Sequence, residues 1–229
     1  MDISGLQKTT LLDYPGKVAC TVFLAGCNLR CPFCHNASLV TRPCPNQMRE
    51  AEFFAFLKKR KGILDGVCVT GGEPTLRPGL PEFLESIKAL GYGVKLDTNG
   101  TNPALLSGLL RRGLVDYVAM DIKASPNRYR EVCGGVDVLE AVQKSVLVLM
   151  DSGVDYEFRT TCVKPFHDEA SLAQIGQWLQ GAKQYYLQAF VDSGDLVGAG
   201  VSGLNKKEME ALRLAVLPYI PTTRLRGIG

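Results

Sequence analysis

The chain has 229 residues, of which 46% are hydrophobic and 21% are charged, and this composition is that of a globular protein rather than a disordered one. Its formal net charge of +3 is too small to indicate nucleic-acid binding. No apolar run reaches the ~18 residues that a membrane helix needs, and the first residues lack the pattern of a secretion signal. We therefore expect a cytoplasmic protein with a single domain over residues 1–229.

Predicted strands and helices alternate along the chain. Short apolar or β-branched runs predict strands, and amphipathic segments predict helices. In chain order these are strand Val18–Leu24, helix Arg49–Lys61, strand Gly66–Thr70, helix Pro81–Leu90, strand Gly93–Asp97, helix Pro103–Arg112, strand Val115–Ile122, helix Val138–Asp151, strand Asp155–Thr161, helix Glu169–Leu179, strand Gln184–Phe190 and a last helix that Asn205 caps. This alternation predicts parallel strands with right-handed crossovers. A complete eightfold barrel typically takes ~250 residues, so we expect an α/β fold of the incomplete (β/α)6 TIM-like barrel type.

Eight cysteines in a chain of this kind indicate metal or redox chemistry rather than a disulfide framework. Three are crowded together, at Cys27, Cys31 and Cys34, and their thiolates could wrap one soft metal centre. A structural zinc ion would need a fourth ligand, which His35 or Cys44 could supply. Because zinc cysteines more often come as two close pairs, the spacing favours a four-iron, four-sulfur cluster with one open iron. The cysteines in apolar surroundings are predicted to be small buried hydrophobic residues: Cys20, Cys68 and Cys162.

Polar motifs follow the predicted strands at their C-terminal ends, where ligands bind in parallel α/β folds. They are Gly71-Gly72-Glu73-Pro74, Leu96-Asp97-Thr98-Asn99-Gly100, Asp121-Ile122-Lys123 and Arg159. The glycines would let the backbone approach a ligand, and Glu73 offers an anion to an ammonium group. Asp97 and Asp121 end adjacent strands and could share a proton or hold a cation. A salt-bridge network that includes Lys123 is the alternative.

Cys27-x-x-x-Cys31-x-Phe33-Cys34 resembles the cluster motif of the radical S-adenosylmethionine (SAM) superfamily. From about residue 4 to residue 190 the sequence is similar to glycyl-radical-enzyme activases, through Leu12-Asp13-Tyr14-Pro15-Gly16, Phe23-Leu24-Ala25-Gly26-Cys27, Cys34-His35-Asn36, Met120-Asp121-Ile122-Lys123 and the motifs above. The Asp-Tyr-Pro-Gly opening and the short length most resemble activating proteins of anaerobic ribonucleoside-triphosphate reductase.

The resemblance implies one [4Fe-4S] cluster ligated by Cys27, Cys31 and Cys34, with SAM chelating the fourth iron. The SAM contacts that it implies are Phe33, Cys34 and His35 near the adenine, Gly72 and Glu73 at the methionine ammonium, Asp121 and Lys123 at the ribose and carboxylate, and Arg159. It also implies a Na⁺ or K⁺ site at Asp97, Thr98 and Asp121. In pyruvate formate-lyase activase a histidine of the sixth strand contacts SAM, whereas this sequence has Phe190 there, with Gln188 nearby.

The function that the resemblance implies is reductive cleavage of SAM to a 5′-deoxyadenosyl radical, which generates a glycyl radical on a partner enzyme. The expected partner is anaerobic ribonucleotide reductase, and the expected electron donor is a flavodoxin or a ferredoxin. Two alternatives are a radical SAM enzyme that acts on a small molecule or peptide, and a zinc-stabilised binding module. No further cysteine set is present for auxiliary clusters.

Overall fold

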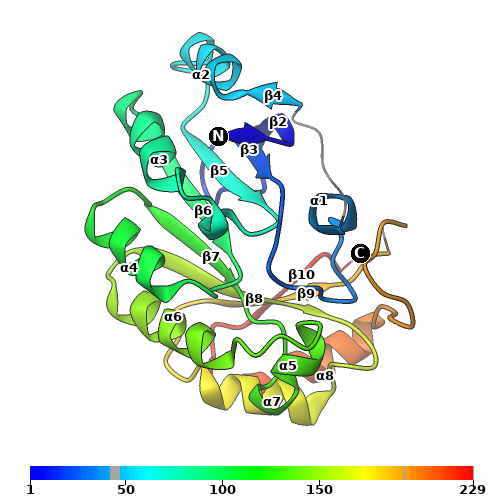
Figure 1. Ribbon diagram of the computed structural model, residues 1–229. Helices are drawn as coiled ribbons and strands as arrows, with labels where there is room; N and C mark the ends of the chain where they lie inside the picture. The colour runs from blue at the N-terminus through cyan, green and yellow to red at the C-terminus, as the bar shows by residue number, and fades with distance from the viewer. Residues whose placement is uncertain (42–46, 193, 229) are drawn as a thin grey trace.

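The computed structural model describes residues 1–41, 47–192 and 194–228. Its main sheet has eight strands in the order β10-β9-β8-β7-β6-β5-β3-β2. Their bounds are β2 Gly5–Thr10, β3 Ala19–Leu24, β5 Gly66–Gly71, β6 Gly93–Thr98, β7 Tyr117–Asp121, β8 Asp155–Cys162, β9 Tyr185–Ala189 and β10 Arg224–Arg226. All neighbours are parallel except β2 and β3, which are antiparallel. The sheet is curved, and its edge strands β2 and β10 do not pair with each other, so the predicted incomplete barrel is confirmed (Figure 1).

The long helices lie on the outer side of the curved sheet (Figure 1). They are α2 Glu50–Lys59, α3 Leu80–Ala89, α4 Pro103–Arg111, α6 Leu139–Asp151, α7 Glu169–Trp178 and α8 Lys206–Val216. Three of them begin at side chains that cap free backbone amides. Asn102 accepts a hydrogen bond from Leu105 N at 3.2 Å, Asp168 accepts one from Ser171 N at 2.7 Å, and Asn205 accepts one from Glu208 N at 3.1 Å. The helices predicted from amphipathic spacing therefore form, each within two residues of its expected bounds.

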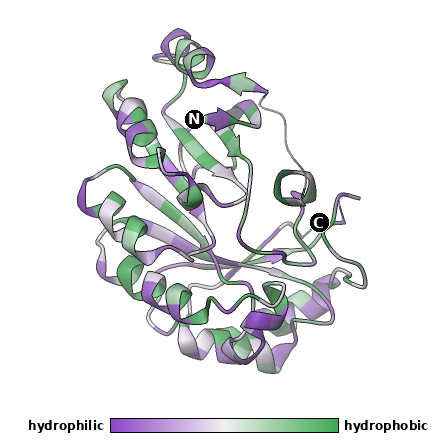
Figure 2. Ribbon diagram, in the orientation of Figure 1, coloured by the Kyte–Doolittle hydropathy of each residue, from purple (hydrophilic) through white to green (hydrophobic). Residues whose placement is uncertain are grey.

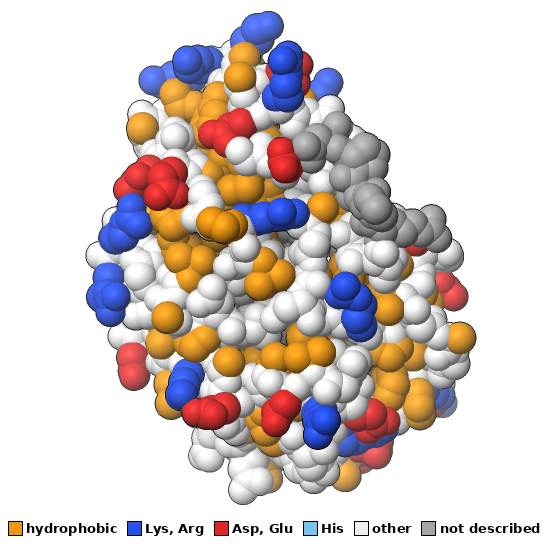
Figure 3. Space-filling model, viewed as in Figure 1, with side chains coloured by type: hydrophobic (Ala, Val, Ile, Leu, Met, Phe, Trp, Pro, Cys, Tyr) orange, Lys and Arg blue, Asp and Glu red, His pale blue; other side chains and the backbone are white. Residues whose placement is uncertain are grey.

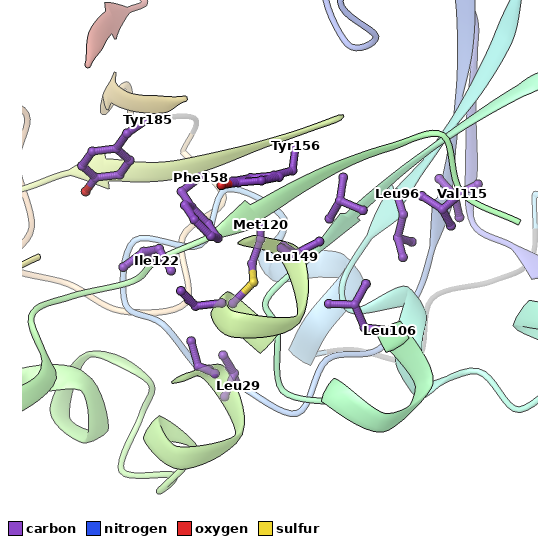
Figure 4. Close-up of a cluster of buried hydrophobic side chains, with 14 of the residues drawn as sticks. Leu29, Leu96, Leu106, Val115, Met120, Ile122, Leu149, Tyr156, Phe158 and Tyr185 are labelled. Carbon is purple, nitrogen blue, oxygen red and sulfur yellow. The ribbon is translucent and has the colours of Figure 1, made fainter. Parts of the chain in front are cut away.

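The hydrophobic core lies between the sheet and these helices. Apolar residues dominate the strands and the inward faces of the helices in Figure 2, and Figure 4 shows part of the core they form. Cys20, Cys68 and Cys162 are fully buried, as predicted. Acidic and basic side chains are interspersed over the face seen in Figure 3. Among the described residues, no helix is long and apolar enough to cross a membrane.

Several short elements were not predicted, because they lack an apolar run. β2 is largely exposed, and β10 is only three residues long with two arginines. The others are the antiparallel pair β1 Asp2–Ile3 and β4 Met48–Arg49, the short helices α1 Ala37–Thr41 and α5 Tyr129–Val132, and the 3₁₀ turns Pro74–Leu76 and Pro126–Arg128. Edge strands need only backbone pairing on one side, so their sequences carry little of the signal that buried strands carry.

A cluster of polar side chains is buried inside the barrel, around Glu157. Glu157 on β8 is 1% exposed, and Arg226 on β10 donates two hydrogen bonds to it, at 2.9 and 3.0 Å. Tyr117 on β7 donates a third from its hydroxyl at 3.1 Å. The Arg226 guanidinium also lies over the ring of Tyr186, 3.9 Å from its centroid. Strand β10 thus supplies the cation that neutralises a buried carboxylate.

Candidate active site

A cavity of about 250 Å³ opens at the C-terminal ends of the strands. Its lining includes nearly all of the predicted site residues, namely Cys27, Cys31, Phe33, Cys34, His35, Gly72, Asp97, Thr98, Asp121, Lys123 and Arg159. Glu73 is the exception. The parallel topology therefore brings together residues that are up to 132 positions apart in the chain, from Cys27 to Arg159.

The loop that carries the three cysteines has no regular secondary structure and is held by side chains at its centre. Leu29 is 2% exposed, and Figure 4 shows it in the same buried cluster as Met120 and Ile122 of the β7 segment. Arg30 donates hydrogen bonds to the carbonyl oxygens of Cys27 and Leu29, at 2.7 and 2.8 Å. Because an apolar anchor and a bridging guanidinium fix the loop, its cysteines are positioned by the protein itself.

The Cys27 sulfur has hydrogen-bond partners. Cys27 Sγ accepts from Leu29 N at 3.4 Å and from Asn99 Nδ2 at 3.7 Å. The thiol of Cys31 interacts with the thiol of Cys133, which lies just after α5. This contact lowers the pKa of Cys31 and raises that of Cys133, whereas burial raises the pKa of Cys27 and of Cys34. Neither Asn99 nor Cys133 was assigned a role from the sequence.

The two kinds of metal centre predicted for these cysteines differ in the spacing of their sulfurs. In the described part of the chain, no group of three or more His, Cys, Asp or Glu side chains is arranged to hold one metal ion. Tetrahedral zinc would bring its sulfurs to about 3.8 Å from one another. Ligands of a [4Fe-4S] cluster stand wider apart, because each binds a different iron, and thiolates are the donors that such clusters take. Of the two residues predicted to complete a zinc site, Cys44 lies outside the described residues and His35 lines the cavity.

Glu73 does not have the place that the sequence predicts. Its carboxylate is 1% exposed and accepts hydrogen bonds from Thr75 N and Oγ1, at 3.1 and 2.5 Å, from Thr98 Oγ1 at 2.8 Å and from Asn99 N at 2.6 Å. Burial raises the pKa of Glu73, and these bonds oppose the rise. The side chain links the end of β5 to the end of β6, and Glu73 is not part of the cavity lining.

The glycines before Glu73 allow two loops to pack together. A Cβ on Gly71 would lie 2.1 Å from the Leu24 carbonyl oxygen, and the backbone at Gly71 has a φ of +128°. Glu73 N donates to the Gly26 carbonyl oxygen at 2.8 Å. The close approach that the sequence predicts is therefore an approach to the backbone that precedes Cys27, and only glycine permits it.

Side chains of alternating charge lie in a row at the floor of the cavity. We call this row the charge ladder, and its members are Lys123, Asp121, Arg159, Asp97 and Lys95. Arg159 donates from Nε to Asp121 at 2.9 Å and from Nη1 to Asp97 at 3.3 Å. Lys123 donates to Asp121 at 2.9 Å, and Lys95 pairs with Asp97. Burial opposes ionisation of both carboxyls, but the neighbouring cations hold the pKa of Asp97 and of Asp121 below the usual range. The salt-bridge alternative is thus realised here.

The predicted Na⁺ or K⁺ site is not formed as one group of oxygens. The Thr98 hydroxyl faces Glu73, and cationic side chains already meet both carboxylates of the ladder. A monovalent cation at Asp97, Thr98 and Asp121 stays a prediction. Lys95 is 2% exposed and was not predicted. Lys95 and Asp97 are two residues apart on one strand, so their side chains lie on the same face. This spacing was the sequence signal from which the ion pair could have been predicted.

Aromatic side chains form the wall beside Lys123. Phe33 is 3% exposed and packs against Phe166 and edge-on against His167, with ring centroids 6.3 and 6.0 Å away. The His167 ring contacts the Lys123 carbonyl oxygen through Nε2 at 3.1 Å. Burial lowers the pKa of His167 to about 4, so this ring is neutral at pH 7. No catalytic role was predicted for His167, which joins the Phe33 wall to the segment that follows β7.

Gln188, rather than Phe190, lines the cavity on β9. The Phe190 ring is buried and meets the His35 ring edge-on, with centroids 5.1 Å apart. Gln188 Oε1 is buried and, among the described residues, has no hydrogen-bond partner. A buried acceptor in a cavity wall costs free energy unless a ligand donor meets it. A ligand bound in the cavity could therefore donate a hydrogen bond to Gln188 Oε1.

Comparison with known proteins agrees with this geometry. Residues 21–178 match the Radical SAM superfamily. A protein of Methanocaldococcus jannaschii whose name describes a glycyl-radical enzyme activating enzyme is 32% identical over 195 residues, which cover 82% of this chain and 79% of that protein. The pyruvate formate-lyase-activating enzyme of Clostridium pasteurianum is 31% identical over 126 residues, 53% of this chain and 52% of the relative.

Solved structures share the fold. SuiB of Streptococcus suis aligns with a TM-score of 0.69 at 15% identity, over 90% of this chain and 49% of that chain. A domain of pyruvate-formate lyase-activating enzyme from Bacteroides vulgatus aligns with a TM-score of 0.58 at 18% identity, over 71% of this chain and 99% of that one. The superfamily match covers more than half of the chain and includes all three cysteines at the cavity, so the chain belongs to the radical SAM superfamily.

Proposed function

We propose that this radical SAM enzyme is a glycyl-radical-enzyme activase. The observation that carries the proposal is the meeting, in one cavity, of three cysteines with a floor of paired charges and an unpartnered glutamine oxygen. Such a site offers soft ligands for iron beside polar groups for an amino acid and a nucleoside. The M. jannaschii relative, similar over most of both chains, supports the activase class.

In this proposal Cys27, Cys31 and Cys34 hold a [4Fe-4S] cluster, and SAM binds beside it. Together these groups supply one-electron reduction of the SAM sulfonium and, from it, the ability to remove a hydrogen atom from a substrate. The protein supplies orientation and excludes water, which is where an enzyme of this kind gains most of its rate. No side chain of the ladder needs to gain or lose a proton for that role.

The remaining cavity residues would orient SAM. Lys123 offers an ammonium group to the methionine carboxylate, and Asp121 offers a carboxylate to the ribose hydroxyls. The backbone at Gly72 lies in the lining, so its polar groups, rather than the Glu73 side chain, would meet the methionine ammonium. The flat wall at Phe33 suits the adenine, and Gln188 Oε1 could accept a hydrogen bond from the nucleoside.

The substrate in this proposal is a backbone glycine on a partner enzyme, anaerobic ribonucleoside-triphosphate reductase, and a flavodoxin or a ferredoxin supplies the electron. Resemblance at Asp13, Tyr14 and Pro15 supports this partner. These residues lie between β2 and β3, at the opposite end of the strands from the cavity, and Tyr14 is 4% exposed. These three residues do not line the site. Their resemblance therefore supports relatedness to this group of activating proteins and does not indicate a contact with the substrate.

The test begins with anaerobic iron–sulfur reconstitution of the full chain. After reduction, low-temperature EPR is recorded with and without SAM, and 5′-deoxyadenosine is assayed in the same sample. We expect a four-iron signal that changes on addition of SAM, together with 5′-deoxyadenosine. Cys31→Ala should remove both, while Cys20→Ala, which alters a buried cysteine away from the cavity, should keep both. Tightly bound zinc without SAM cleavage would contradict the proposal.

The partner is tested separately. Wild-type protein is mixed with SAM, reductant and a purified anaerobic ribonucleoside-triphosphate reductase, and the glycyl-radical EPR doublet is measured. A reductase whose radical-bearing glycine is changed to alanine serves as the control. A doublet only with the intact glycine supports the partner. SAM cleavage without a doublet would contradict this partner but leave the radical SAM chemistry standing.

A further inference from the structure

The sulfur of Cys27 receives hydrogen bonds from two separate parts of the chain. Leu29 N, in the cysteine loop itself, donates to it at 3.4 Å. The side-chain amide of Asn99, 72 residues further along the chain, donates from Nδ2 at 3.7 Å. Asn99 follows directly after β6. A residue at the end of a different strand therefore contacts one of the three cysteines.

The orientation of the Asn99 amide is fixed by its neighbours. Thr101 N and Thr101 Oγ1 lie 3.0 and 2.7 Å from Asn99 Oδ1. A backbone N–H can only donate, so the amide atom that faces it must be the oxygen. The Nδ2 group is then turned toward Cys27 and Asn28, and Asn28 Oδ1 accepts from it at 3.0 Å. The contact with the sulfur is therefore made by a donor.

Both N–H bonds of the Asn99 amide are used by protein atoms. Asn99 belongs to the cavity lining but is only 5% exposed. Its amide nitrogen carries two hydrogens, and within the described residues one meets Cys27 Sγ and the other Asn28 Oδ1. The side chain is thus directed at the cysteine rather than at a molecule in the cavity. Because an amide group does not titrate, this donor is present at every pH at which the protein is folded.

The turn that carries Asn99 is held from two sides. Asn99 N donates to the buried Glu73 carboxylate at 2.6 Å. Ser145 Oγ, on α6, donates to the Gly100 carbonyl oxygen at 2.6 Å. Gly100 itself has a φ of +75°, a conformation that favours glycine, so the chain turns sharply just after Asn99. The position of the amide donor is therefore set by the backbone that carries it.

A hydrogen bond to a sulfur that binds iron affects electron uptake. In the proposed function Cys27 is a thiolate ligand, and an N–H group directed at its sulfur stabilises negative charge there. Reduction adds a negative charge to a cluster, so the reduced form gains more from this donor than the oxidised form. Hydrogen bonds to sulfur are among the features that set the reduction potential of iron–sulfur clusters. Loss of the donor should therefore lower the potential.

We propose that Asn99 is a positioning residue whose side-chain amide donates to Cys27 Sγ and raises the reduction potential of the cluster. This inference rests on the proposed function, because it needs a cluster at Cys27, Cys31 and Cys34. It goes beyond that function by assigning to a buried amide, fixed in place by Glu73, control over how readily the enzyme accepts its electron.

The experiment is an EPR-monitored redox titration of the reconstituted full chain without SAM. Asn99→Leu removes the donor and keeps most of the side-chain volume, and Asn99→Ala removes both. Thr101→Val is the matched control, because it deletes a hydroxyl of the same hydrogen-bond network but leaves the Asn99 donor and Thr101 N in place. At the wild-type midpoint potential we expect the ratio of reduced to oxidised cluster to fall about threefold in both Asn99 variants, which is within the range for one hydrogen bond. For a one-electron couple this is about 28 mV, since a tenfold change is 59 mV.

A second measurement does not depend on the stability of the Asn99 variants. Pulsed EPR is recorded on the reduced cluster of wild-type protein whose asparagine side-chain amides carry the isotope ¹⁵N. A hydrogen bond from Asn99 Nδ2 to Cys27 Sγ should give a coupling between the cluster and a ¹⁵N nucleus. Thr101→Val should keep this coupling, and Asn99→Ala should lose it.

The outcomes separate the two proposals. A lowered potential in both Asn99 variants, with the wild-type potential in Thr101→Val, supports the role of Asn99. An equal shift in Thr101→Val would mean that the network matters only for structure and would overturn it. An unchanged potential in both Asn99 variants at full iron and sulfide content, or a wild-type cluster without ¹⁵N coupling, would also overturn it while leaving the proposed function intact. Failure of the wild type to assemble a cluster would defeat both.

Discussion

Gly72 and Gly26 approach so closely that a Cβ on Gly72 would lie 2.0 Å from the Gly26 carbonyl oxygen. Gly72→Ala should therefore separate the β5 loop from the cysteine loop, lower the free energy of unfolding by about 1–3 kcal/mol and reduce iron incorporation. Urea unfolding and iron content measure the two effects. Gly108→Ala is the matched control, because nothing lies within 4 Å of a Cβ there and the site is helical. Equal stability of the two variants would contradict the contact.

Glu73→Gln tests whether Glu73 is structural. A carboxylate accepts all four of its hydrogen bonds, whereas the amide group of glutamine would turn a donor toward one or more of these donors. We expect a loss of about 1–3 kcal/mol in the free energy of unfolding of protein without cofactors, measured by urea denaturation. Unchanged stability with weakened SAM binding would instead support the ammonium contact predicted from the sequence.

Arg159→Leu should remove the cation that two buried carboxylates share. Breaking a buried pair typically costs about 3–5 kcal/mol, whereas an exposed pair is worth up to about 1 kcal/mol. The exposed pair Arg112 and Glu85 provides the control variant Arg112→Leu. Because the folded pKa of Asp121 lies below its usual range, this stabilisation is present above about pH 4 and is lost as the pH falls. The difference between wild type and Arg159→Leu should therefore shrink progressively as the pH falls below about 4, which thermal unfolding can measure.

His167 should make the fold sensitive to mild acid. Burial lowers its pKa to about 4, against about 6.5 in an unfolded chain, so the unfolded state binds more protons as the pH falls. Stability is then full above about pH 6.5 and declines toward pH 4, by about 2 kcal/mol between pH 7 and pH 5. His167→Gln should flatten this part of the urea-unfolding profile, and His35→Gln should leave most of it. An unchanged slope in His167→Gln would contradict the assignment.

Gln188→Leu should weaken SAM binding, if Gln188 Oε1 accepts a hydrogen bond from the nucleoside. One such bond is worth about 0.5–1.5 kcal/mol, so we expect an increase in the dissociation constant of roughly two- to tenfold. Equilibrium dialysis of the reconstituted protein measures it. Gln177→Leu changes an exposed glutamine on α7 and should have no effect. Equal affinities for the two variants would remove Gln188 from the SAM site.

The sequence predicts the parts of the fold in which a buried pattern repeats. Strands β3, β5 and β7 are runs of mainly apolar residues, and β5, β6 and β7 have a polar residue at or just before the C-terminal end. A strand buried on both faces needs apolar residues throughout, so these strands and their order along the chain can be predicted from the sequence. β2 and β10 are edge strands without such a run, so no local sequence pattern predicts them.

The residues of the site also fall into those that the sequence predicts and those that it does not. Residues on strand ends, such as Asp121 and Arg159, were found because parallel topology alone brings them to one edge. Glu73 is buried between two loops rather than in the cavity lining, and this could not be predicted because the side that a loop residue faces depends on loop geometry rather than on periodicity. Asn99 was given no role because its partner, the Cys27 sulfur, lies in another loop. Contacts between two loops leave no spacing that a single sequence could show.

Arg226 and Glu157 are 69 residues apart in the chain, and the docking of strand β10 brings them together. A chain that lacks β10 would hold the buried Glu157 carboxylate without its guanidinium, so the interior of the barrel depends on the last strand. None of the described residues of β10 lines the cavity, so this strand supports the site from outside it.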